Sequence, residues 1–395
     1  MKEKLADLWA IIWRPLIALA ILIALAAAII LPGLHEYRTF VSPLEDPKVL
    51  AITEKSKLID SAAFLPQRTV QAALLKFGFD TPAYLRLVSV AMAVSCIVAM
   101  YYILRHWYTA RVAIFGTILF GTSSWFLHQA RSAEFGISYI FAALTLICIG
   151  IWASERKKPD LLPIVALFTG LTLYVPGFWL LVLFSVLFGR KEVGFMWSKS
   201  RTSAKLLSGI LFLGSLAPLA FSLFRQPHQY QQVLGLVGGE KALSVRAFGD
   251  NFVNIWQGFF ISGVDEPLRW LIGTPILDIT SIILLGLGIY SYQSGLHPIR
   301  YKTILGGLVV SAILMTLGGF EFIGIALVFS YLFIAAGIGL LLQQWFSVFP
   351  RNPFARTIGV LCIAVLVGAV AYFHASRYYI GWSHADSTLK VIIRK

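Results

Sequence analysis

Long apolar stretches recur along the whole chain and restrict it to one class of fold. A helix needs roughly 20 apolar residues to cross the hydrocarbon core of a bilayer, which is about 30 Å thick. Backbone groups inside lipid must be hydrogen-bonded within their own segment, and these stretches are continuous rather than alternating, so helices are expected instead of barrel strands. Of the 395 residues, 58% are hydrophobic and 13% are charged, against roughly 25% charged residues in a soluble domain. The sequence therefore predicts an all-α integral membrane protein, a polytopic helix bundle.

The apolar stretches divide into about eleven transmembrane helices, which we expect to form a single transmembrane domain over residues 1–395. The first stretch is long for the apolar part of a signal peptide, so an uncleaved anchor is favoured. The fifth and sixth spans adjoin at "YVPGFW", where Pro176 and Gly177 break the helix, so this pair could instead be one kinked or re-entrant element. The expected spans are 15–34, 85–104, 111–127, 134–152, 161–175, 177–189, 206–224, 276–292, 303–319, 321–342 and 357–374.

The positions of Lys and Arg in the loops predict the orientation. With the N-terminus in the cytoplasm, the inner segments hold about half of the 33 Lys and Arg, and the short outer turns hold only Arg131. An odd number of spans then places the C-terminus outside. Most of the 19 carboxylates fall on the outer side, so any chemistry is expected there. The net charge of +14 reflects the inner loops and attraction to anionic membrane lipid, and no nucleic-acid partner is expected.

Two long outer loops, 35–84 and 225–275, each contain a candidate interfacial helix. In 245–260, "VRAFGDNFVNIWQGFF", the apolar residues repeat at helical spacing, which is typical of a helix that lies in the membrane interface. The second candidate is 66–79, "PQRTVQAALLKFGF", which begins with Pro66 in its favoured first position and has Val70, Ala73, Leu74 and Phe77 on one side. Two such helices would roof a vestibule for a lipid-linked substrate.

Residues 74–137 carry a specific order of apolar and polar elements. A Phe-Gly precedes the span, Arg86-Leu87 with Ser89 begins it, Arg111 follows the inner turn, and "SWFLH" ends the next outer stretch before Arg131. This order resembles the second to fourth helices of polyprenyl-phosphate-sugar-dependent glycosyltransferases of the GT-C fold. The similar branch is that of protein mannosyltransferases and aminoarabinose transferases. Residues 168–184 and 271–290 are similar to further helices of the same family.

The resemblance implies transfer of a sugar from a polyprenyl-phosphate donor to an acceptor on the outer face of a bacterial plasma membrane. The reaction inverts the anomeric carbon and needs no metal or cofactor. An acid in the first outer loop would take the proton of the acceptor, and cations would hold the leaving lipid phosphate. The family often has Asp-Glu followed by a cation at this place, and Glu45-Asp46 before Lys48 matches in reversed order. Pro47 is a departure, and Glu36 is the rival candidate.

The resemblance also assigns substrate binding to the turn before the fourth span. Arg131 and Glu134 are three residues apart, so on a helix they would share one side, near the catalytic cleft. The alternative places Arg131 in the headgroup layer with Glu134 capping or pairing it, and His128 as an interfacial anchor. Asp265, Glu266 and Arg269 before the eighth span could hold a metal ion or a lipid phosphate, or could form a capped, solvated turn.

One position departs from the family in charge. Relatives often carry Arg-Tyr where this chain has Glu321, and an acid cannot hold a lipid phosphate. The three cysteines lie within spans and show no metal-ligand spacing, and no Ser-His-Asp arrangement is readable. A catalytically inactive GT-C-like scaffold that acts in lipid binding, transport or envelope assembly is therefore the second hypothesis. Neither the sugar nor the acceptor follows from the sequence.

Overall fold

The computed structural model describes residues 14–34, 43–48, 50, 52–53, 61, 63–156, 159–236, 245–293 and 298–392. Within these ranges all regular structure is helical and there is no strand, so the predicted all-α class is confirmed there. The first half of the chain forms α2 (Arg14–Ile30), η2 (Pro43–Glu45), α4 (Leu65–Lys76), α5 (Pro82–Trp107), α6 (Ala110–Thr122), α7 (Ser124–Arg131), α8 (Gly136–Arg156), η3 (Pro159–Leu161), α9 (Leu162–Thr172), α10 (Phe178–Phe188) and α11 (Arg190–Lys199). The second half forms α12 (Thr202–Arg225), η4 (Pro227–Gln229), α13 (Tyr230–Leu234), α14 (Val245–Gln257), η6 (Gly258–Ser262), α15 (Ile279–Gln293), α16 (Pro298–Gly318), η7 (Gly319–Phe322), α17 (Ile323–Val348), α18 (Pro353–Ser376), η8 (Arg377–Trp382) and α19 (Asp386–Ile392).

The chain is an integral membrane protein. Four helical stretches of the described residues are long and apolar enough to cross a bilayer, namely Pro82–Trp107, Thr202–Arg225, Arg300–Val348 and Pro353–Trp382. The pair α6 and α7, which is bent by 61°, could make a fifth. Each stretch that the sequence marks as a span contains a helix, but several of these helices are shorter than a bilayer is thick. The count of eleven spans therefore stays a prediction.

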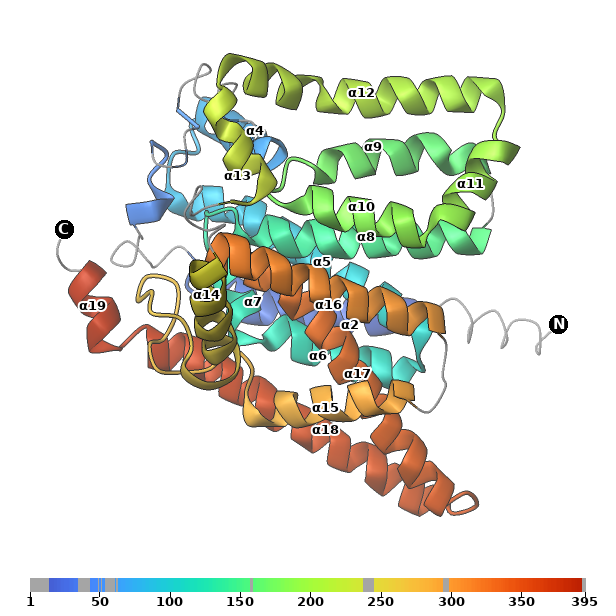
Figure 1. Cartoon of the computed structure of the whole chain (residues 1–395). Helices are drawn as coiled ribbons and strands as arrows, with labels where there is room; N and C mark the ends of the chain where they lie inside the picture. Colours follow the sequence, from blue (N-terminus) through green and yellow to red (C-terminus); the bar gives the residue numbers. More distant parts are fainter. Residues whose placement is uncertain are drawn as a thin grey trace.

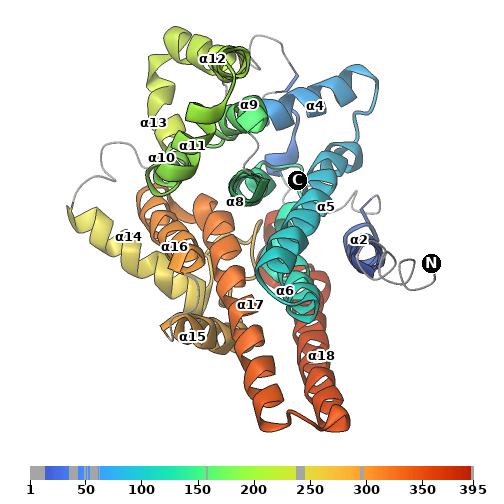
Figure 2. The ribbon, with the colours of Figure 1, turned by 90° about the vertical axis from the view of Figure 1, so that its right-hand side faces the viewer.

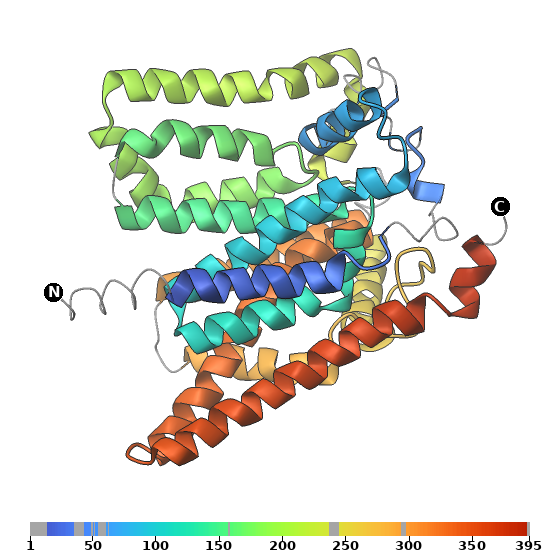
Figure 3. The same ribbon diagram turned by 180° about the vertical axis from the view of Figure 1, so that it is seen from behind.

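The long helices run side by side along one axis (Figure 1). Figure 2 looks along this axis and shows α9, α10 and α12 on one side of the bundle, α18 on the opposite side and α2 at the flank beside α5 and α6. Short helices gather at the end where α4, α13, α14 and α19 lie, whereas α11 lies at the other end (Figure 1). Seen from behind, α2 begins at the end that is remote from α19 (Figure 3).

Helix α17 is the centre of the bundle and contacts α6, α8, α15, α16 and α18. Its sequence is apolar on all sides, as expected of a helix enclosed by other helices. The backbones of α15 and α17 meet at two glycines, because a Cβ on Gly288 or on Gly337 would lie about 2 Å from a backbone oxygen of the other helix. Small residues at such contacts allow helices in membranes to approach closely.

The third predicted span is broken rather than straight. Ser123 has an extended backbone between α6 and α7, and its hydroxyl donates to the carbonyl oxygen of Phe120 (2.8 Å). The resulting bend buries nearly all of α7 at the end of the bundle where the short helices gather. His128, Gln129 and Arg131 are thereby placed inside the protein and not at its rim.

Helix α4 exposes its apolar face and buries its polar one. Gln67, Arg68 and Gln71 are buried against the bundle, whereas Val70 is 51% and Phe77 is 77% exposed. An exposed apolar face is stable only where it meets another apolar medium, such as the acyl region next to the headgroups. Helix α14 likewise exposes Phe252 and buries Ile255, so both helices have the amphipathic character that the sequence predicts.

Candidate functional site

A cavity of about 590 Å³ opens at the end of the bundle that carries the short helices. The cavity is lined by Leu44, Leu50 and Phe64, and by residues of the α7–α8 junction, η4 with α13, the loop before α15, and η7. Its lining includes the aromatic side chains Phe64, Trp125, Phe135, Tyr139 and Phe320. It also includes a cluster of charged groups. A large cavity with few convergent polar groups is the general form of a ligand site.

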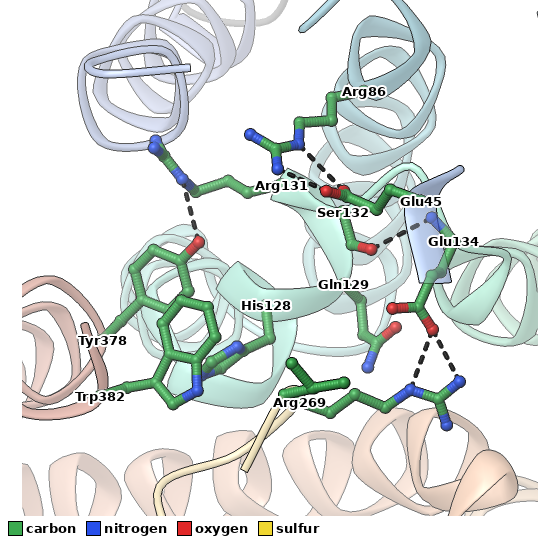
Figure 4. Close-up of a pocket in the computed structure, with 11 residues that line it drawn as sticks. Glu45, Arg86, His128, Gln129, Arg131, Ser132, Glu134, Arg269, Tyr378 and Trp382 are labelled. Carbon is green, nitrogen blue, oxygen red and sulfur yellow. Dashed lines mark hydrogen bonds and ion pairs between the residues drawn. The ribbon is translucent and has the colours of Figure 1, made fainter. Parts of the chain in front are cut away.

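Arg269 is the centre of this charged cluster and binds three carboxylates from three parts of the chain. Its Nε and Nη2 lie 2.9 and 2.7 Å from Oε2 of Glu134 (Figure 4). Its Nη1 lies 2.5 Å from Oε1 of Glu321 and 3.3 Å from Oε2 of Glu266. The three carboxylates exceed the single guanidinium in charge, and they keep the pKa of Arg269 above its usual value although burial acts in the other direction. Arg269 therefore stays charged at all physiological pH values.

Glu134 differs from the other two carboxylates in its burial. Only 15% of its side chain is exposed, against 45% for Glu266 and 38% for Glu321. Burial raises the pKa of Glu134 to about 7, because it outweighs the attraction of Arg269, and the negative charges of Glu45 and Glu321 add to the rise. A carboxyl group with a pKa near neutrality exchanges protons readily under physiological conditions.

Glu321 belongs to the site, although the sequence marks it only as a missing cation. It is in η7, between two long helices, and it reaches Arg269 across 52 positions of sequence. A contact of this separation has no local signal. The sequence showed the change of charge at Glu321, but it did not show that Glu321 binds Arg269.

Glu45, the first candidate for the catalytic acid, is an internal ion-pair partner. Its carboxylate forms a bidentate ion pair with Arg86, with 2.9 Å between Arg86 Nε and Oε1, and accepts the N–H of Ala133 at 2.7 Å (Figure 4). Both side chains are more than nine-tenths buried. Glu45 lines only a second cavity of about 50 Å³, which suffices for little more than a water molecule. The pair ties η2 to the start of α5 and to the α7–α8 junction.

The other two candidate acids of the first loop lie away from the large cavity or outside the described residues. The carboxylate of Asp46 accepts the backbone N–H of Lys48 at 2.8 Å, which is a local turn contact. Glu36 lies in the segment 35–42, outside the described residues. Asp265 is exposed and lines neither cavity, so of the two acids before the eighth span only Glu266 joins the cluster.

The expectation that one helix carries Arg131 and Glu134 on one side is wrong. Helix α7 ends at Arg131, Ser132 is extended, and the two side chains point apart (Figure 4). Arg131 donates to the carbonyl oxygens of Ile30 (2.5 Å) and Pro32 (2.8 Å) and to the phenol oxygens of two tyrosines that follow α18, Tyr378 and Tyr379. It therefore joins the end of α2 to η8.

His128 is enclosed rather than placed at the membrane surface. It is 8% exposed, and its ring lies edge-on to Tyr378 and Trp382, with 4.6 Å between the ring centres in each case. Three further side chains, which the sequence did not bring together, form a hydrogen-bonded chain. Ser124 Oγ is 2.9 Å from Nδ1 of His374, and Nε2 of His374 is 3.0 Å from Asp278. Ser124 and His374 are fully buried, so these hydrogen bonds connect α7, α18 and the start of α15.

Among the described residues, no group of three His, Cys, Asp or Glu side chains has the arrangement of a metal site. Neither a family model nor a curated protein sequence matches this chain. The resemblance to GT-C glycosyltransferases thus depends on the elements quoted from the sequence alone. The chemical argument for the site depends on its own geometry.

Proposed function

We propose that this chain is a membrane glycosyltransferase of GT-C type that transfers a sugar from a polyprenyl-phosphate donor to an acceptor on the outer face. In this proposal the single transmembrane domain has about eleven helices and lies in a bacterial plasma membrane, with the N-terminus in the cytoplasm and the C-terminus outside. The sequence resemblance supports the class of reaction. The geometry of the cavity supports a specific choice of base.

The observation that carries the proposal is the position of Glu134. This carboxyl group lines the large cavity, lies beside an arginine, and has a pKa of about 7. A general base is most effective when its pKa is close to the working pH. Glu45 does not line this cavity, and its oxygens are occupied by Arg86 and Ala133 inside the protein.

Glu134 and Arg269 would act in sequence. The acceptor hydroxyl or amine gives its proton to Glu134 as its oxygen or nitrogen bonds to the anomeric carbon. The bond from that carbon to the phosphate oxygen breaks, and the electron pair leaves with the lipid phosphate. Protonated Glu134 no longer attracts the guanidinium strongly, so Nε and Nη2 of Arg269 become available to the departing phosphate.

The second candidate is a catalytically inactive scaffold that acts in lipid binding, transport or envelope assembly. One observation favours it: among the residues that the structure describes, Arg269 is the only lysine or arginine that lines the large cavity, and three carboxylates already hold it. A phosphate must compete with these carboxylates, which weakens its binding.

The deciding experiment measures transfer of radiolabelled sugar from a panel of polyprenyl-phosphate sugars by the purified protein in lipid nanodiscs. We expect Glu134→Gln to reduce turnover by about a hundredfold or more. The matched control is Glu266→Gln, which removes another carboxylate from Arg269 but leaves the base in place, and it should keep most of the turnover. Full activity of Glu134→Gln would exclude this base. Binding of donors without turnover by the wild type would favour the scaffold.

A further inference from the structure

We infer that the segment formed by η4 and α13 reads the hydroxyl groups of the donor sugar, through the amide side chains of Gln231 and Gln232. This inference rests on the proposed function, because it assigns a sugar subsite within the same cavity. The sequence showed no motif at 227–234, and the assignment comes from where the fold places this segment.

The segment supplies most of the neutral polar side chains that line the cavity. His228, Gln229, Gln231 and Gln232 all line the cavity, and they come from five consecutive positions of "PHQYQQ". An amide side chain both donates and accepts hydrogen bonds, which matches a sugar hydroxyl that does the same. The Nε2 of Gln231 has only a long contact of 3.3 Å to the Tyr230 hydroxyl. Within the described part of the chain the amide of Gln232 has no hydrogen-bond partner.

The aromatic rings among the lining residues suit the apolar C–H face of a sugar. Phe64 and Phe135 are stacked with 5.0 Å between ring centres, and Tyr139 meets Phe64 edge-on at 5.5 Å. Phe64 has a left-handed backbone with φ of 57°, which is costly for a residue with a large side chain. Its N–H donates to the carbonyl oxygen of Tyr174 at 2.8 Å, and this bond fixes the ring at the cavity. The C–H face of a sugar ring would lie on these rings while its hydroxyls meet the amides.

The backbone of α13 is fixed to the break between α9 and α10, beside which it lies (Figure 1). The N–H of Gly177 donates to the carbonyl oxygen of Val233 at 2.9 Å, and the indole N–H of Trp179 donates to that of Leu234 at 3.2 Å. Gly235 has φ of +84°, and a Cβ built there would lie 3.1 Å from Cα of Gly177. Binding side chains on an immobilised backbone lose less entropy when a ligand arrives.

The break at "VPGFW" therefore has a structural role, which is to hold α13 in place. Helix α9 ends at Thr172, and the N–H of Gly177, the residue before α10, anchors α13. The same break brings Pro176 to the cavity wall. The break between the fifth and sixth predicted spans thus positions η4 and α13, which we propose recognise the sugar.

The test is equilibrium binding of two kinds of probe to the full chain in nanodiscs. The probes are undecaprenyl phosphate and its mannosyl, glucosyl and 4-amino-4-deoxyarabinosyl derivatives. We expect at least one glycosylated probe to bind the wild type more tightly than undecaprenyl phosphate does. The double variant Gln231→Leu/Gln232→Leu should weaken that probe about tenfold, the effect of roughly one lost hydrogen bond to a ligand, and leave undecaprenyl phosphate unchanged.

Two controls separate recognition from folding. Gln343→Leu makes the same chemical change at the exposed surface of α17, away from the cavity, and should change neither affinity. Gln232→Asn keeps the amide but shortens it, and should change the order of preference among the sugars. If the double variant keeps the wild-type affinity for the glycosylated probe, or weakens both kinds of probe equally, the subsite is overturned and the transferase proposal stands. If the wild type binds none of the four probes, both proposals fail.

Discussion

Glu45 and Glu134 show how the surroundings of one side-chain type decide what it can do. Glu45 is paired within the protein to Arg86, and its oxygens are held by three N–H groups. Glu134 faces a cavity and shares its arginine with two other acids. The first arrangement stabilises a junction of segments, and the second leaves a carboxyl group whose proton can be exchanged.

The pH dependence of turnover should follow Glu134. A base acts only when deprotonated, so kcat/KM should fall as the pH drops through about 7, the pKa of Glu134. Glu321→Gln removes a negative neighbour that raises this pKa, and it leaves Arg269 more available to the Glu134 carboxylate. The acidic limb of the profile should therefore move to lower pH in this variant. A profile that keeps its midpoint would show that another group titrates.

Removal of the Glu45 carboxylate should cost stability rather than chemistry. Glu45→Gln takes the charged partner from Arg86, a guanidinium that is 6% exposed. Loss of one member of a buried ion pair costs about 3 kcal/mol. The free energy of unfolding, measured by denaturant titration in detergent, should fall by this amount. Asp46→Asn is the control and should cost much less, since its contact is a local turn; equal losses would contradict the assignment.

The contacts of the site could not be predicted as pairs from the sequence. The sequence marked Glu134 and, separately, Glu266 and Arg269 as candidates for binding, without indicating that they meet, and Glu321 was expected only to exclude phosphate. Residues 52 and 135 positions apart meet because whole helices pack, and local patterns carry no information on such packing. Arg131 was misplaced for a local reason, because the helix it was assigned to ends at that residue.

At the scale of elements, apolar stretches located the helices well, and breaks within them were read less well. A stretch of apolar residues has the same composition whether it is straight or bent by 61° at Ser123. The amphipathic pattern of 66–79 correctly gave a helix, but it could not tell which face turns inward; the structure turns Val70 and Phe77 outward. Helix α13 was not expected, because its five residues are too few to show the helical repeat of apolar residues.

Gly177 is a position between two elements where a side chain would be strained. It has φ of +74°, and a Cβ there would lie 2.7 Å from Leu314 and 2.8 Å from Phe322. Gly177→Ala should lower the free energy of unfolding by ~1–2 kcal/mol from the left-handed backbone alone, and it should displace α13. Thermal unfolding in detergent measures the first effect. Gly209→Ala in α12, where a Cβ would meet nothing within 4 Å, should not lower stability and serves as the matched control.

At the scale of the whole molecule, the cavity lies at one end of the bundle and α2, the first described helix, begins at the other end. The short helices and α19 lie at the cavity end, whereas α2 begins at the other end (Figures 1 and 3). The distribution of Lys and Arg predicts that the α2 end is cytoplasmic. The two observations together put the cavity on the outer side in our proposal.

Fusion reporters check this orientation directly. Alkaline phosphatase, which is active only outside the cytoplasm, should be active when fused after residue 392, and green fluorescent protein at the same place should be dark. A reporter in the loop between α17 and α18, at 349–352, should give the reverse result. Activity of the phosphatase at 349–352 would invert the topology and place the cavity in the cytoplasm.

The short length of α9 and α10 has a consequence for the lipid around the protein. Each has 11 residues, so each is about 17 Å long, far less than the roughly 30 Å of the hydrocarbon core. A bilayer becomes locally thinner next to apolar segments that are shorter than its hydrocarbon core. Since these two helices meet at the cavity wall, the bilayer should be thinnest there, and a long-chain lipid would bring its headgroup to the opening without leaving its leaflet.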